Sequence, residues 1–278
     1  MHSGLISHPD YKLEYFLYGT GPRTLIVFHG FNNNAQDFES LGRIAGERYT
    51  IIAINIFFHG NSTVENHLIE SGFSNDDLRQ LFGDIFNVRP ADKYTLMGYS
   101  LGGRICLRLF ELFPTMIDEI VLLAPDGIRI NPFYKFLTGT GIGRGIMRYA
   151  VHNPGLFESL AGFLRRTRIV SEKRYQFARS NFENEEKREQ VYKVWMTLRN
   201  VRSERTSIKN LLQKTGVRLH LFFGKFDKII PVSIGRNFQK GAEKQIRLNV
   251  LEEGHRLVKP ETLQKVMNLI KNDDLSSS

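Results

Sequence analysis

Three residues of this sequence could together carry out nucleophilic catalysis: a serine, a histidine and an aspartate that each follow a predicted β-strand. Ser100 is the central residue of the motif G-Y-S-L-G, and Asp227 and His255 follow two later strands. A serine hydroxyl becomes an effective nucleophile only when a neighbouring base removes its proton, and imidazole, with a pKa of about 6.5, suits that task. A carboxylate beside the imidazole fixes its tautomer and stabilises the imidazolium that forms. The sequence therefore predicts Ser100 as nucleophile, His255 as general base and Asp227 as the acid that orients it.

The surroundings of Ser100 are those of a sharp turn between a strand and a helix. A strand is predicted over 94–97 and a helix over 101–113, which is the structural context that a G-x-S-x-G motif requires. Gly98 and Gly102 lack the Cβ atoms that would clash where the chain doubles back. The first turn of the helix would also present unpaired N–H groups, and the positive end of its dipole, to an anionic intermediate.

Three loop motifs resemble those of the α/β-hydrolase superfamily, and the resemblance extends over about residues 13–269. They are the turn at Ser100, the segment G-K-F-D-K-I-I-P that carries Asp227, and the segment E-G-H that carries His255. The order serine, aspartate, histidine along the chain is also that of this superfamily. The resemblance implies a serine hydrolase with an inserted cap. Asp126, which follows the strand predicted over 119–123, is an alternative acid, since some relatives carry the acid there.

The same resemblance implies an oxyanion hole formed by two backbone N–H groups. The segment His29-Gly30-Phe31 follows an apolar strand, and its likeness to relatives implies that Phe31 donates one of these hydrogen bonds. Leu101, the residue after the nucleophile, would donate the other. Losing one such donor typically costs about 3–4 kcal/mol of transition-state stabilisation. His29 itself is expected to be structural rather than catalytic.

The segment 55–62 departs from the pattern of many relatives, which carry D-x-x-G-x-G-x-S at this point. Here Asn55 and Phe58 replace the aspartate and the first glycine, whereas Gly60 and Ser62 remain. We interpret the segment as a structural turn whose local contacts differ from those of the family.

Strands that alternate with helices predict an α/β fold, with a mostly parallel sheet covered by helices on both faces. The alternation stops after residue 126 and resumes near 206, so we expect an α/β core over 1–126 and 206–278 and a helical lid inserted at 127–205. We expect the glycine-rich stretch 139–145 to be a flexible turn in that lid. The predicted strands are 13–18, 24–28, 50–56, 94–97, 119–123, 217–223 and 245–251, and the predicted core helices are 35–47, 76–86, 101–113, 232–241 and 261–271.

The net charge of +9 is concentrated in the predicted lid. Residues 127–205 contain sixteen Lys and Arg against seven Asp and Glu, which accounts for the whole excess. The charge either covers a solvated helical surface or raises the local concentration of anionic substrates. Arg165, Arg166 and Arg168 are candidates for the second role. Nucleic-acid binding is not expected, because no recognition module is present.

Other features favour a protein of the cytoplasm that acts without a cofactor. Cys106 is the single cysteine, so no intramolecular disulfide can form, and it is expected in the core. Residues 1–19 do not resemble a secretory signal peptide, and no apolar run reaches the roughly 18–20 residues of a membrane span. The histidines form neither an H-E-x-x-H motif nor a Cys/His cluster, so no metal site is expected.

The serine at position 100 narrows the reaction class. In this superfamily, haloalkane dehalogenases and epoxide hydrolases use aspartate there, so both are disfavoured. Hydrolysis of a small or medium acyl substrate remains, with an ester or a thioester the preferred choice. The alternatives are carbon–carbon bond hydrolysis, perhydrolysis, a non-hydrolytic ligand receptor and a lipase that acts at a membrane surface. Acyl-chain length, leaving group and oligomeric state are not determined by the sequence.

Overall fold

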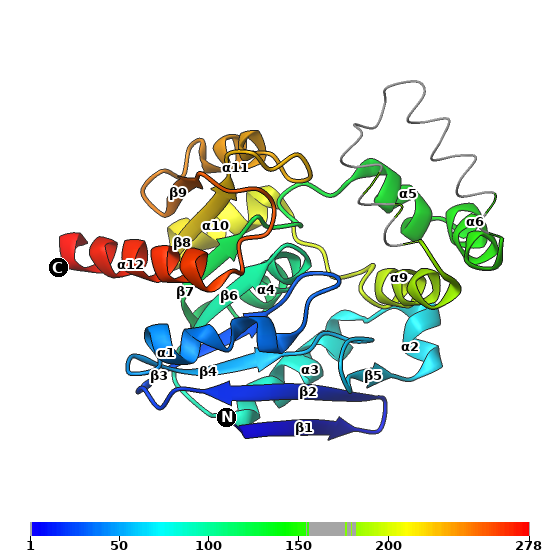
Figure 1. Ribbon diagram of the computed structural model, residues 1–278, viewed down its shortest axis with the longest axis horizontal. Coiled ribbons are helices and arrows are strands. Elements are labelled where there is room, and N and C mark those ends of the chain that lie inside the picture. The colour runs from blue at the N-terminus through cyan, green and yellow to red at the C-terminus, as the bar shows by residue number, and fades with distance from the viewer. Residues whose placement is uncertain (1, 154, 156–175, 177–178, 180–181, 278) are drawn as a thin grey trace. The chain divides into compact units, whose positions relative to one another are not determined.

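The computed structural model describes residues 2–153, 155, 176, 179 and 182–277 of the protein (Figure 1). The chain divides into two compact units. The first consists of 1–64, 75–129 and 201–278, and the second of 65–74 and 130–200. The sequence predicted a single insertion at 127–205 and did not predict that 65–74 would belong with it. Arg165, Arg166 and Arg168 lie outside the described residues.

The first unit is built on a mostly parallel sheet, as the alternation of strands and helices predicted. The strand order is β1-β2-β4-β3-β6-β7-β8-β9, with β5 paired to β2. The strands from β4 and β3 to β9 run parallel, whereas β1, β2 and β5 pair antiparallel at one side. The bounds are β1 His2–His8, β2 Tyr11–Tyr18, β3 Arg23–Phe28, β4 Tyr49–Ile54, β5 Thr63–Val64, β6 Tyr94–Tyr99, β7 Ile117–Leu123, β8 Arg218–Gly224 and β9 Ile246–Leu251.

The central strands are buried along almost their whole length because helices cover both faces of the sheet. All six residues of β6 are buried, and five of the six in β3 are buried. On one face, Val27 packs in a cluster with Phe38, Leu41 and Leu263 from η1 (Ala35–Phe38), α1 (Ser40–Ala45) and α12 (Pro260–Ser277). On the other face, α4 (Leu101–Leu112) packs against β3 and β6. Cys106 of α4 is fully buried, as expected.

Several elements differ from the sequence-based expectation. The helix predicted over 35–47 is divided into η1 and α1, with Asn34 capping η1 through its side chain. The strands β1 and β5 were not predicted. The helices α2 and α10 were not predicted either. The remaining helices of the described residues are α2 Asn66–Ser71, α3 Asn75–Val88, η2 Pro114–Met116, α5 Pro132–Gly139, α6 Gly141–His152, α9 Glu185–Thr197, α10 Arg205–Thr215 and α11 Val232–Gln239.

In the second unit, the glycine-rich stretch 139–145 is the junction of two helices and not a flexible turn. Residue Thr140 separates α5 from α6 and caps α6, since its hydroxyl oxygen accepts a hydrogen bond from the N–H of Gly143 at 2.9 Å. A Cβ atom on Gly143 would lie 2.2 Å from the carbonyl oxygen of Phe136. The glycine is therefore required where the two helices approach each other. Among the described helices of the chain, none is long and apolar enough to cross a membrane.

Candidate active site

The residues predicted to do chemistry follow strands that are neighbours in the sheet. Phe31 follows β3, Ser100 follows β6, and Asp227 and His255 follow β8 and β9. These strands are parallel, and only β7 lies between β6 and β8. Because parallel strands end at a common edge, the four residues come to the carboxyl edge of one sheet, which is where ligands bind in open α/β folds.

Ser100 stands on a strained turn. Its φ of 49° and ψ of −111° are unusual for any residue with a side chain. Two backbone hydrogen bonds hold it there: its N–H donates to the carbonyl of Leu123 at 2.9 Å, and its own carbonyl accepts from the N–H of Asp126 at 2.8 Å. Both partners belong to the end of β7 or the residues after it. The neighbouring strand therefore stabilises the turn that projects the serine from the sheet.

The two glycines of the serine motif are required by close backbone approaches. A Cβ atom on Gly98 would lie 2.5 Å from the carbonyl oxygen of Gly102. A Cβ atom on Gly102 would lie 2.1 Å from the carbonyl oxygen of Phe28, the last residue of β3. The glycines thus allow α4 to begin directly against the end of a neighbouring strand, as their spacing around Ser100 predicted.

His255 and Asp227 form a short hydrogen bond at this edge. The imidazole Nδ1 lies 2.7 Å from Oδ2 of the carboxylate, whose side chain is completely buried. The other carboxylate oxygen, Oδ1, accepts hydrogen bonds from the N–H groups of Ile229 at 2.7 Å and Ile230 at 2.9 Å. With Nδ1–H donated to the carboxylate, the lone pair of the ring is on Nε2. The arrangement can therefore hold a histidine as a base in one tautomer and one orientation.

Asp126, the alternative acid, has a different partner. Its carboxylate forms an ion pair with Arg104 of α4, which is itself buried, and it accepts a hydrogen bond from the N–H of Gly127 at 2.8 Å. Of the two candidate acids, Asp227 is the one that contacts His255.

The two predicted oxyanion donors lie on segments that approach Ser100. Leu101 is the first residue of α4, so its N–H has no acceptor within the helix. Phe31 lies next to Gly30, where a Cβ atom would come within 3.1 Å of the Cβ of Ser100. Both N–H groups are thus in segments from which a substrate oxygen at Ser100 could be reached.

His29 connects this loop to the rest of the core. Its Nδ1–H donates to the carbonyl of Gly30 at 2.7 Å, and its Nε2 accepts from the N–H of Ile56 at 3.0 Å. The ring is fully buried and lies edge-on to His59, with ring centroids 4.8 Å apart. Burial, together with His59, lowers the pKa of His29 to about 3. The imidazole is therefore neutral at neutral pH and serves as a link between two backbone segments.

Sequence reasoning did not single out two residues near the site. Tyr99, the residue before the serine, is buried with its ring centroid 5.5 Å from that of His255. Burial and the nearby Asp227 raise the pKa of the Tyr99 phenol above its usual range. Glu14 of β2 accepts a hydrogen bond from Asn55 at 2.6 Å. The motif could have drawn attention to Tyr99, but no local pattern pairs Glu14 with a residue forty-one positions later.

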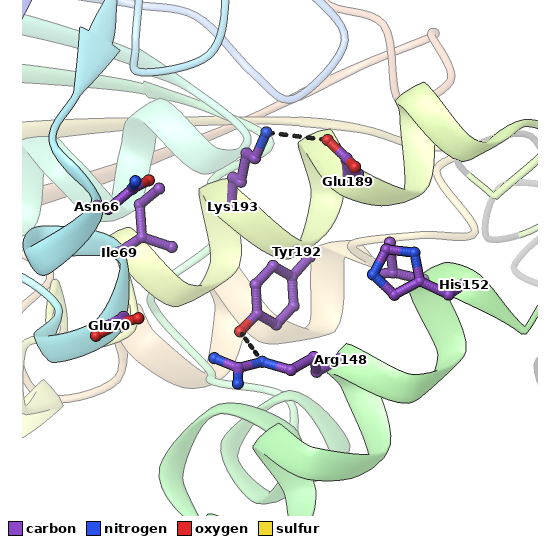
Figure 2. A pocket seen from close by; sticks show the side chains of 9 residues that line it. Asn66, Ile69, Glu70, Arg148, His152, Glu189, Tyr192 and Lys193 are labelled. Atoms are coloured by element: carbon purple, nitrogen blue, oxygen red, sulfur yellow. Dashed lines mark hydrogen bonds and ion pairs between the residues drawn. The ribbon is translucent and has the colours of Figure 1, made fainter.

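The second unit contains a pocket of about 340 Å³ between α2, α6 and α9 (Figure 2). Several of its polar side chains contact one another or a neighbouring residue. Lys193 lies 3.0 Å from Glu189, one turn earlier in α9, and the Nε–H of Arg148 donates to the Tyr192 hydroxyl at 3.4 Å. His152 lies 3.3 Å from Glu185. Because these contacts join the pocket's own helices without a ligand, we regard the pocket as a seam between packed helices.

Comparison with known proteins identifies the family. The family model described as alpha/beta hydrolase fold matches residues 23–149, which contain β3, the serine turn and α4. The chain belongs to the α/β-hydrolase superfamily. This α/β-hydrolase is 24% identical over 238 residues to an uncharacterized hydrolase of Bacillus subtilis (strain 168), YugF, with 84% of each chain covered.

Solved structures of other α/β-hydrolases share its fold. A thermophilic esterase from Thermogutta terrifontis superposes with a TM-score of 0.67 at 15% identity, covering 98% of this chain and 99% of the esterase. The thioesterase domain from the curacin biosynthetic pathway superposes with a TM-score of 0.64 at 14% identity, covering 97% and 99%. At these identities the likeness establishes the fold, and the activity has to be argued from the site. Within the described residues, no group of three or more His, Cys, Asp and Glu side chains could hold a metal ion.

Proposed function

We propose that this α/β-hydrolase is a serine hydrolase that cleaves a small or medium ester or thioester through an acyl-serine intermediate. The observation that carries the proposal is the pair formed by the buried Asp227 and Nδ1 of His255, at the sheet edge where Ser100 occupies a strained turn. A buried carboxylate that orients a histidine, at the same sheet edge as a serine held at positive φ, is what general-base catalysis requires.

In the proposed reaction, the hydroxyl oxygen of Ser100 attacks the carbonyl carbon of the substrate while Nε2 of His255 removes the hydroxyl proton. The oxyanion that forms accepts hydrogen bonds from the N–H groups of Phe31 and Leu101. When the intermediate collapses, the bond to the alcohol or thiol breaks and the imidazolium returns its proton to that leaving group. Water then attacks the acyl-serine with His255 again as base, which releases the carboxylic acid and restores the serine.

Fixed electrostatics would provide much of the rate acceleration. Each oxyanion donor is expected to contribute about 3–4 kcal/mol, because a donor positioned in advance needs no reorganisation when charge develops. Asp227 stabilises the imidazolium, and the amides of Ile229 and Ile230 hold its carboxylate in place. Membership of the superfamily supports hydrolysis as the reaction class, and an esterase and a thioesterase domain are among the proteins of like fold.

The proposal is tested by an activity panel with a matched variant. Wild type and Ser100→Ala are assayed on p-nitrophenyl esters of increasing acyl length and on a thioester series, and both are treated with a fluorophosphonate probe. We expect turnover and labelling in the wild type alone. Labelling without turnover on any substrate would favour the receptor or carbon–carbon hydrolase alternatives. Retention of most of the turnover by Ser100→Ala would refute the serine mechanism. A lid function for the insertion remains a prediction.

A further inference from the structure

We infer that Glu14, acting through Asn55, is a positioning residue for the loop that carries the oxyanion donor Phe31. The carboxylate that many relatives place at the start of the 55–62 turn is provided in this chain from β2 instead. The inference rests on the proposed function, since it assigns a role within the same site.

Asn55 is a fully buried link between Glu14 and the loop after β3. Its Oδ1 accepts a hydrogen bond from the N–H of Ala35 at 2.7 Å, and its Nδ2 donates to Oε2 of Glu14 at 2.6 Å. The two partners fix the orientation of the amide, because only the oxygen can accept from an N–H and only the nitrogen can donate to a carboxylate. Ala35 is the residue at which the loop ends and η1 begins.

The loop is thus held at both ends by two consecutive residues. Asn55 holds its end at Ala35, and the N–H of Ile56 donates to the imidazole of His29, where the loop begins. Phe31 lies between these two anchors. A displacement of Asn55 would therefore move the segment that carries the proposed donor relative to Ser100.

Glu14 is held as firmly as the amide that it contacts. Its carboxylate also accepts hydrogen bonds from the backbone N–H and the side-chain amide of Asn61, at 3.0 Å and 2.6 Å. Burial raises the pKa of Glu14, but the hydrogen bonds from Asn61 and Asn55 outweigh it and lower the pKa. Ser62 closes the arrangement, since its hydroxyl accepts from the N–H of Glu14 and donates to the carbonyl of Asn55.

The backbone of the turn is shaped around this pair. Gly60 has a φ of 55°, and a Cβ atom there would lie 2.2 Å from Oε2 of Glu14 and 2.3 Å from Nδ2 of Asn55. Phe58 keeps a φ of 65° although it replaces the glycine of the family pattern. The turn thus has a left-handed backbone at Phe58 and Gly60 and leaves room for a carboxylate that comes from another strand.

Exchanging the carboxylate of Glu14 and the amide of Asn55 tests the inference. Asn55→Asp should place a second carboxylate about 2.6 Å from Oε2 of Glu14, and the repulsion should displace the anchor of Ala35. Because oxyanion donors act in the transition state, we expect kcat to fall at least tenfold with KM changed less than threefold. The double variant Glu14→Gln with Asn55→Asp removes the repulsion and restores an amide–carboxylate pair with the roles reversed. The amide nitrogen cannot accept from the N–H of Asn61 as Oε2 does, so kcat should recover at least threefold over Asn55→Asp without reaching the wild-type value.

The matched control is Glu47→Gln, which removes one carboxylate at an exposed position. All variants are assayed at a temperature at which circular dichroism shows them folded, and Glu14→Gln alone replaces Asn55→Asp if the latter does not fold. Equal kcat in every variant, or no recovery in the double variant, would overturn the inference while the wild type still turns over substrate. Absence of both turnover and labelling of Ser100 in the wild type would instead refute the proposed function, and the positioning role with it.

Discussion

Acid should destabilise this protein through His29, because this histidine is buried and resists protonation in the folded state. The imidazole is neutral in the folded state because burial and His59 hold its pKa at about 3, against 6.5 for an unperturbed histidine. Below pH 6.5 the unfolded chain therefore binds a proton at this position that the folded chain does not bind. Stability is fully present above that pH and is lost as the pH falls toward 3.

The size of the effect can be worked out from the same shift. One pKa unit corresponds to about 1.4 kcal/mol, so the whole interval from 6.5 to 3 amounts to about 5 kcal/mol. Between pH 7 and pH 5 the unfolded state becomes almost fully protonated while the folded state does not, which gives a loss of about 2 kcal/mol from His29 alone. Burial also lowers the pKa of His59, so this second histidine acts in the same direction.

Urea unfolding at pH 7 and pH 5 measures this loss. In His29→Gln, the side-chain oxygen can still accept the hydrogen bond from Ile56, but no proton is taken up on unfolding. We expect the variant to lose about 2 kcal/mol less than the wild type between the two pH values, whatever its stability at pH 7. His2→Gln, which removes an exposed histidine, is the matched control. An unchanged pH dependence in His29→Gln would show that His29 is not held neutral in the fold.

Four further outcomes are expected. Ser100→Ala should abolish ester hydrolysis and change the free energy of unfolding by less than about 1 kcal/mol, as measured by turnover and urea unfolding. Asp227→Asn should lower kcat by roughly 10³–10⁴-fold, and Asp126→Asn far less; the reverse order would make Asp126 the acid. Gly102→Ala should destabilise by about 2 kcal/mol or more because of the contact with Phe28, whereas Gly83→Ala, which has open space around it, should not lower the melting temperature. If the basic excess of the insertion acts on substrates, kcat/KM should fall more steeply with salt for an anionic ester than for a neutral one; equal falls would assign these charges to a solvated surface.

The parallel core and the candidate site could be predicted because their signals are local. A strand such as β3, buried on both faces, has an uninterrupted apolar run over Leu25–Phe28, and this shows in the sequence. The serine motif requires its glycines for steric reasons, so its spacing specifies the turn before any tertiary contact is known. Asp227 and His255 each follow a strand that was predicted from the sequence, and the parallel pairing of β8 and β9 then brings them to one edge.

The remaining features depend on contacts between distant residues. The edge strand β1 is largely exposed and has no apolar run, so only its pairing with β2 makes it a strand. Residues 65–74 join the second unit because α2 packs against α9, and because Arg199, which follows α9, donates a hydrogen bond to the carbonyl of Ile69. The hydrogen bond between Glu14 and Asn55 also joins residues that are distant in the sequence. In each case the partner lies many residues away, so the pattern of residues within one segment cannot predict the contact.

Backbone strain gives a further reason to place function at the carboxyl edge of the sheet. The non-glycine residues with positive φ in the described parts of the chain are Asn32, Phe58, Ser100 and Ala124, and they follow β3, β4, β6 and β7. Each such conformation costs about 1–3 kcal/mol and persists only where surrounding contacts enforce it. Those contacts are present: Ala124 donates to the carbonyl of Phe222, and Phe58 to that of Ser62. If stability alone mattered, glycine would be favoured at these four positions, because it adopts positive φ at little cost. Their gathering on four neighbouring strands around Ser100 therefore indicates that this edge is shaped for chemistry as well as for packing.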